Sequence, residues 1–166
     1  MTPAITALLL AVFPFSAAIA DETVFLDTLS GNWHGSGQVR LNPGAVPLAV
    51  SCSLDSRANG AALNLAGACR AKVVFSRRIG VDLRASGTRY TGSYVGSRRG
   101  AARLVGTRTG ATLNLQIIWP DKGTSSRVAS MRLASVGTGH MQIVTIEPHP
   151  QTGEQVITAK IELTRN

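Results

Sequence analysis

The sequence is poor in the residue types that carry out catalysis. It has only nine Asp and Glu residues, which are scattered, and three histidines, His34, His140 and His149, none directly beside an acidic residue. There is no G-x-S-x-G nucleophile elbow, no clustered carboxylate pair of the glycosidase kind and no known metal-ligand spacing. We therefore expect a protein that is not an enzyme and that needs neither a metal ion nor a cofactor.

Cysteine is scarce as well. Cys52 and Cys69 are the only two, and they lack the close C-x-x-C spacing of catalytic redox pairs. In an oxidising compartment an even number of cysteines predicts a disulfide, which the chain-entropy model credits with about 3 kcal/mol for a loop of this length. We predict a Cys52–Cys69 disulfide that joins two strands of one hairpin, or joins the hairpin to the segment after it.

Long hydrophobic runs are absent after residue 20. Residues 4–20 carry no charge and end in Ala18-Ile19-Ala20, the small-x-small pattern that precedes a signal-peptidase site. The pattern predicts a cleaved signal peptide over residues 1–20, although residues 1–3 lack the usual Lys or Arg. The alternative is an uncleaved membrane anchor, for which the run is slightly short of the roughly 20 apolar residues of a span. We expect a periplasmic or secreted mature chain, residues 21–166, with one domain and no transmembrane segment.

Positive charge, in contrast, is abundant. Lys and Arg number 17, giving a formal net charge of +8, and most are arginine, whose planar fork suits carboxylate, phosphate and sulfate groups. Residues 70–108 hold ten basic residues and a single acid, Asp82. Because these basic residues alternate with apolar ones, we expect them on the solvated side of the strands or in loops. This face is either ordinary solvated surface or a cationic patch for polyanions.

The pattern of apolar residues has a period of two from Leu29 onward, and no stretch has a helical period. Turn-forming residues divide the chain into about nine short segments at a spacing of roughly 8–12 residues, which is typical of a β-barrel or β-sandwich. We predict an all-β fold, a single antiparallel β-barrel of about 8–10 strands. Residues 21–30 are the exception, where a short helical turn would cover one end of the barrel.

The first predicted strand opens with Gly31-Asn32-Trp33. A G-x-W at this place in an exported all-β chain resembles the lipocalin/calycin superfamily. The resemblance implies that Trp33 packs across the closed end of the barrel, against a basic residue near the last strand. Lys160 and Arg165 are the candidates for that basic residue.

The same strand is similar to the first strand of nitrobindin-like barrels, in which a Gly-x-Trp-x-Gly run also occurs. Gly31, Trp33 and Gly35 match that run. The resemblance implies a haem-ligating histidine late in the chain, and His140 is the one candidate. Its flanking residues do not match the pattern, so we do not expect haem.

The first functional hypothesis is an exported, non-enzymatic binding protein whose barrel holds a small apolar ligand. Ligand contacts are predicted at Trp33, Leu113, Leu115 and Ile117. A second apolar face, made of Ile157, Ile161 and Leu163, is predicted to complete the barrel interior.

The alternative hypothesis is a packed barrel that acts through its surface. Its partner would be an anionic envelope component or another protein, for example an enzyme that it inhibits, and nucleic acid is not expected. The predicted contact residues are Arg98, Arg99, Arg103 and Arg108.

Overall fold

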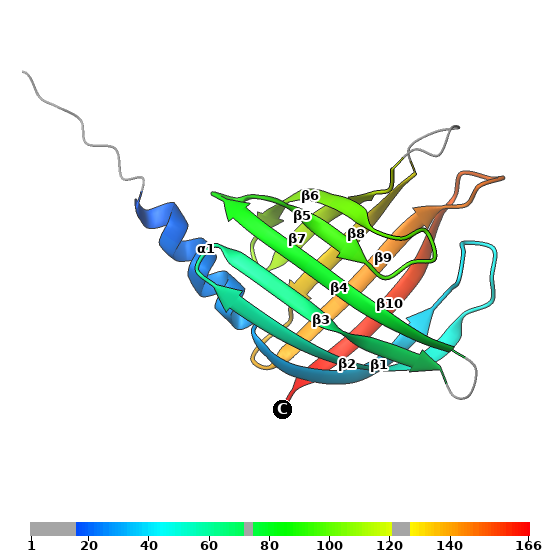
Figure 1. The fold of residues 1–166 in the computed structure, drawn as a ribbon, viewed down its shortest axis with the longest axis horizontal. Helices are drawn as coiled ribbons and strands as arrows, with labels where there is room; N and C mark the ends of the chain where they lie inside the picture. The colour runs from blue at the N-terminus through cyan, green and yellow to red at the C-terminus, as the bar shows by residue number, and fades with distance from the viewer. Residues whose placement is uncertain (1–15, 72–74, 121–126) are drawn as a thin grey trace, which may run out of the picture.

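The structure, a computed structural model, describes residues 16–71, 75–120 and 127–166. One helix, α1 (Ser16–Thr28), precedes ten strands (Figure 1). The strands are β1 (Gly31–Val39), β2 (Leu48–Asn59), β3 (Ala62–Ala71), β4 (Phe75–Ser86), β5 (Arg89–Val95), β6 (Ala102–Thr109), β7 (Thr112–Ile118), β8 (Val128–Ser135), β9 (His140–Pro148) and β10 (Gln155–Arg165).

The strands form a closed antiparallel barrel. Each strand pairs with the next along the chain, and β1 also pairs with β10, which closes the sheet. At the closure Trp33 of β1 lies opposite Leu54 of β2 on one side and Arg165 of β10 on the other. The predicted all-β barrel is thereby confirmed, and the sandwich alternative falls because a sandwich leaves strand edges that this sheet does not have.

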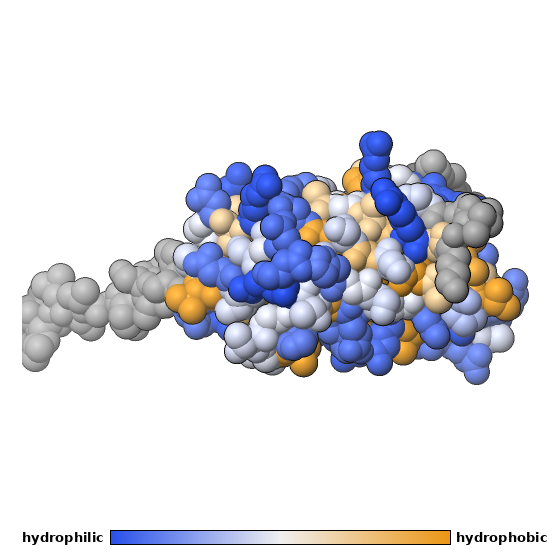
Figure 2. Space-filling view, turned by 90° about the horizontal axis from the view of Figure 1, so that it is seen from below, coloured by the Kyte–Doolittle hydropathy of each residue, from blue (hydrophilic) through white to orange (hydrophobic). Residues whose placement is uncertain are grey.

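Alternating burial along the strands places the core inside the barrel. On β7, for example, Leu113, Leu115 and Ile117 are buried while the residues between them are exposed or half-buried. The outer face of the barrel mixes hydrophilic and hydrophobic residues (Figure 2). This is the arrangement that the period of two predicts for a sheet with one face in water.

Glycine lets the first strand curve tightly against the last. A Cβ added at Gly35 would lie 1.9 Å from the carbonyl oxygen of Glu162, and one at Gly37 would lie 2.1 Å from that of Lys160. Any larger residue would push the two backbones apart. The Gly35-Ser36-Gly37 run is therefore a requirement of barrel closure at the β1–β10 seam.

The predicted interior face of the last strand is wrong at one position. Ile161 and Leu163 are buried, but Ile157 is 50% exposed. The pairing of β10 with β9 shifts register between Ile157 and Ala159, which is a β-bulge. One extra residue in a strand reverses which side chains point inward, so Thr158 is buried in place of Ile157.

One end of the barrel is covered by α1, which packs beside β2 (Figure 1). Leu26 and Leu29 are fully buried there. Trp33 is 1% exposed, donates its indole N–H to the Leu29 carbonyl oxygen at 3.0 Å, and has the Arg165 guanidinium 4.7 Å from its ring centroid. Arg165 is thus the basic partner of Trp33, while Lys160 lies 3.5 Å from Glu162 and is exposed.

The helix also contains a buried polar cluster. Glu22, 2% exposed, accepts hydrogen bonds from the Tyr90 hydroxyl and from Arg108 Nε, the latter at 2.9 Å. Asp21 accepts a further bond from Arg108, and the guanidinium of Arg108 lies 5.0 Å from the Phe25 ring centroid. These contacts tie the helix to β5 and β6 and confirm that the segment after residue 20 covers an end of the barrel.

Most of the predicted signal peptide, residues 1–15, lies outside the described residues. The helix α1 runs across the predicted cleavage site between Ala20 and Asp21. Within the described part of the chain, no helix is both long and apolar enough to cross a membrane.

Candidate functional site

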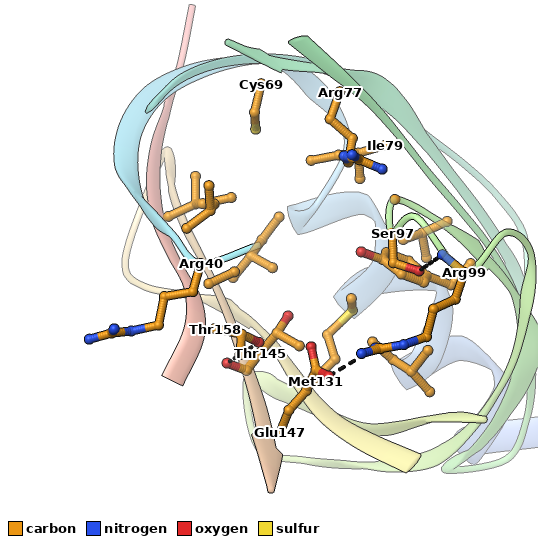
Figure 3. Close-up of a pocket in the computed structure, with 18 of the residues that line it drawn as sticks. Arg40, Cys69, Arg77, Ile79, Ser97, Arg99, Met131, Thr145, Glu147 and Thr158 are labelled. Carbon is orange, nitrogen blue, oxygen red and sulfur yellow. Dashed lines mark hydrogen bonds and ion pairs between the residues drawn. The ribbon is translucent and has the colours of Figure 1, made fainter. Parts of the chain in front are cut away.

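The end of the barrel opposite α1, called the mouth here, opens into a cavity of about 320 Å³ (Figure 3). The mouth is bordered by residues 40–47, 96–101 and 149–154, which connect β1 to β2, β5 to β6 and β9 to β10. The deeper walls are aliphatic and include Leu65, Val81, Ile117, Met131, Leu133, Ile143 and Ile161. The cavity therefore combines aliphatic deeper walls with charged and polar residues at its mouth, among them Arg98, Arg99 and Glu147.

An ion pair crosses the mouth from one wall to the other. Arg99, in the β5–β6 loop, donates to Glu147 of β9 at 2.9 Å, and its guanidinium lies 5.1 Å from the ring centroid of Trp119. The Glu147 side chain is only 12% exposed, and Arg127 Nε lies 3.9 Å from the same carboxylate oxygen. Two arginines of the described part of the rim thus share one carboxylate.

A third arginine points into the barrel from β4. Arg77 lines the cavity, and its side chain is directed toward the cavity centre in Figure 3. The inward-facing residues of β4 after it are Ile79, Val81 and Leu83, all apolar. Arg77 contradicts the expectation that the strand arginines point to solvent. Its position in step with Ile79 and Val81 was the available sign that it faces inward.

Tyr94 of β5 completes the polar layer at the mouth. Its ring meets Trp119 edge to face at 6.4 Å, and its hydroxyl lies against Gly96, where a Cβ would stand 2.3 Å from that oxygen. Burial, together with the nearby Glu147 carboxylate, raises the pKa of Tyr94 to about 12, against an opposing effect of Arg77. The tyrosine therefore remains a neutral hydrogen-bond donor at neutral pH.

The predicted disulfide is present and belongs to the cavity wall. Cys52 and Cys69 lie directly opposite each other on β2 and β3, and both are almost fully buried. Cys69 lines the cavity. The bridge therefore joins two strands of one hairpin, the first of the two predicted alternatives, and it faces the interior.

The predicted ligand-contact residues divide between two depths of the barrel. Ile117 lines the cavity. Trp33, Leu113 and Leu115 are buried nearer the end that α1 covers, where they pack in the closed core. The periodicity of β7 identified inward-facing residues correctly, but it carries no information on which part of the interior is filled.

The four predicted surface arginines also lie in different places. Arg98 and Arg99 line the mouth, and Arg103 is exposed on the outside of β6 close to it. Arg108 lies at the opposite end, where its side chain is 13% exposed and bonded to Glu22. Arg108 is therefore part of the closed end and shares no surface with the other three.

No histidine is among the described residues that line the cavity. His140 is exposed at the start of β9, beside Thr164 at the end of the barrel away from the mouth. His149 lies in the β9–β10 loop. Among the residues that the structure describes, no three His, Cys, Asp or Glu side chains cluster in a way that would hold a metal ion.

Comparison with known proteins bears on the fold. No protein-family model and no curated protein matches this sequence. Among solved structures, the chain is similar to the crystal structure of Rv2717c from M. tuberculosis, with a TM-score of 0.63 and 15% sequence identity, over 91% of this chain and 98% of that chain. At this identity the similarity shows a shared barrel fold; membership of the lipocalin/calycin superfamily does not follow from it.

Proposed function

We propose that this protein is an exported, non-enzymatic binding protein that holds a small apolar ligand in the barrel cavity. The observation that carries the proposal is the cavity of about 320 Å³ that opens at the mouth. Small-molecule pockets range from about 300 to 1,000 Å³, with mostly apolar walls and a few polar groups that orient the ligand. The aliphatic walls and the polar rim of this cavity match that description.

The two ends of the barrel differ in a way that supports ligand binding at the mouth. The closed end is filled by large side chains, among them the fully buried Leu26, Leu29 and Trp33. Close packing there gives the barrel a rigid base. Burial of an apolar ligand against Ile117, Met131 and their neighbours would then gain roughly 25 cal/mol for each Å² of apolar surface removed from water.

The buried disulfide agrees with export, because such bridges persist in oxidising compartments. Cleavage after Ala20 would shorten α1 but would leave in place Glu22, Leu26 and Leu29, the side chains that hold the helix on the barrel. The mass of the protein recovered from the periplasm or medium of its host tests this step. We expect an N-terminus at Asp21, and a chain that retains residues 1–20 would contradict export by cleavage.

Ligand binding is tested by titration with N-phenyl-1-naphthylamine, an uncharged apolar probe. The chain has two tryptophans, of which Trp119 lines the cavity and Trp33 lies in the closed end. We expect saturable probe fluorescence with energy transfer from Trp119. That transfer should persist in Trp33→Phe and fall markedly in Trp119→Phe, because Trp119 lies at the cavity wall.

A filled cavity supplies the second arm of this test. Ile143→Phe adds volume inside the cavity, while Val136→Phe adds the same kind of side chain at an exposed position of the closed end. We expect Ile143→Phe to weaken probe binding at least tenfold and Val136→Phe to leave it unchanged. No saturable binding by the unaltered protein, or equal binding by both variants, would rule out the proposed function.

A further inference from the structure

We infer that the ligand is an amphiphile with an anionic oxyacid head group, held by Arg77 and Arg99 at the mouth while its apolar tail occupies the cavity below. The inference rests on the proposed function, since it concerns the same cavity. It goes further because it names the chemical class of ligand and the side chains that select it.

The first support is the distribution of charge inside the mouth. Among the described residues, those that line the cavity and carry charge are four arginines and one acid: Arg40, Arg77, Arg98, Arg99 and Glu147. Figure 3 shows Arg77 of β4 and Arg99 of the β5–β6 loop pointing inward from neighbouring elements, and Arg40 pointing away (Figure 3). Arg40 is also bonded to the Ala45 carbonyl oxygen within its own loop. The two inward arginines are therefore the ones that a ligand in the cavity would meet.

The second support is that the Glu147 carboxylate is already paired with arginine side chains. It accepts a 2.9 Å bond from Arg99, and Arg127 approaches the same oxygen at 3.9 Å. Among the described residues that line the cavity, Glu147 is the one carboxylate, beside the guanidinium groups of Arg77, Arg98 and Arg99. In a partly desolvated site this surplus favours an anion, because charge interactions are weakly screened there.

The third support is the position of the charge relative to the apolar walls. Arg77 stands at the mouth end of β4, and the inward residues that follow it toward the closed end are Ile79, Val81 and Leu83. The Arg99 guanidinium lies over the indole ring of Trp119, and its nitrogen atoms point across the mouth. A head group at the rim and a tail along the aliphatic walls would satisfy both halves of the site, and planar guanidinium forks suit carboxylate, sulfate and phosphate oxygens.

The test compares decanoate with decan-1-ol, which have tails of equal length and differ in head-group charge. Each competes against N-phenyl-1-naphthylamine at pH 8 in low salt. We expect decanoate to bind at least tenfold more tightly than decan-1-ol, and we expect this preference to shrink as NaCl is raised. Acetate, which has the head group without the tail, should not displace the probe at millimolar concentration.

Arg77→Met is the decisive variant, and Arg78→Met is its matched control. Arg78 is the next residue of the same strand but is exposed on the outer face, so both variants lose one charge and only one of them alters the cavity. We expect Arg77→Met to weaken decanoate binding about tenfold to a hundredfold, with decan-1-ol unaffected. Arg78→Met should behave as the unaltered protein.

The outcomes separate this inference from the proposed function. If decan-1-ol and decanoate bind equally, or if Arg77→Met and Arg78→Met are alike, the anionic head group is wrong and the apolar-ligand function stands. If acetate competes as well as decanoate, the site takes a small anion and the amphiphile is wrong. If neither ten-carbon ligand nor the probe binds, both are wrong. Should Arg77→Met fail to fold, a salt-independent decanoate preference in the unaltered protein overturns the inference.

Discussion

Arg108→Met probes the polar cluster under α1. In the native barrel Arg108 Nε lies 2.9 Å from Oε1 of Glu22, and Glu22 is 2% exposed. Methionine keeps the apolar stem of the side chain beside the Phe25 ring but removes the charge. The Glu22 carboxylate is then buried with the Tyr90 hydroxyl as its remaining partner in this cluster.

The expected cost is large because a buried charge loses its counter-charge. Removing one partner of a buried ion pair costs about 3–5 kcal/mol. The bond to Asp21 adds little, since that side chain is 67% exposed and exposed pairs contribute about 0–1 kcal/mol. For a chain of this size each kcal/mol lowers Tm by roughly 2–4 °C, so we expect Arg108→Met to melt roughly 6–20 °C below the unaltered protein.

Urea denaturation followed by circular dichroism measures the free energy of unfolding. A second variant, Glu22→Leu combined with Arg108→Met, removes both charges and leaves no unpaired carboxylate in the core. It should recover about 2 kcal/mol or more relative to Arg108→Met alone, because an apolar pair can replace a buried ion pair at little cost. A loss below about 1 kcal/mol for Arg108→Met, or strictly additive effects in the double variant, would refute this reasoning.

Three further outcomes follow from the structure. Because Cys52 and Cys69 are buried, dithiothreitol should leave the folded disulfide intact until urea is added, as alkylation and mass spectrometry will show, and Cys52→Ala with Cys69→Ala should cost about 3 kcal/mol. Burial raises the pKa of Tyr90 and Tyr94, that of Tyr94 to about 12. The folded state therefore keeps phenol protons that the unfolded chain loses near pH 10. Phenolate absorbance should stay low at pH 10–11, and the free energy of unfolding should fall as pH rises from 10 toward 12. Gly35→Ala places a Cβ 1.9 Å from a backbone oxygen of β10, and we expect little folded protein by circular dichroism.

The strands and their turns were largely predictable, because each strand shows its alternation locally. The β7 face of Leu113, Leu115 and Ile117 is inward as predicted. The prediction failed at Ile157 because a bulge is set by pairing with β9, a property of two strands rather than one.

The arginines show the limit of reasoning from the local density of charge. Arg77 and Arg78 are adjacent and chemically identical, yet Arg77 lines the cavity and Arg78 is exposed. Arg108, predicted for a binding surface, instead pairs with the buried Glu22 of a helix 86 residues away in sequence. A high local density of positive charge predicts attraction to anions, but it does not say which side chains share a surface.

The sequence by itself determined the class of this protein. Its period-two pattern and turn spacing indicate an all-β barrel or sandwich, its two cysteines predict a disulfide, and Gly31-Asn32-Trp33 marks the start of the first strand. Only the tertiary structure decided that one end is filled and the other is hollow. Whether a cavity remains depends on how side chains from all ten strands and α1 pack together. Those residues are far apart in sequence, so no short stretch of the chain predicts the cavity.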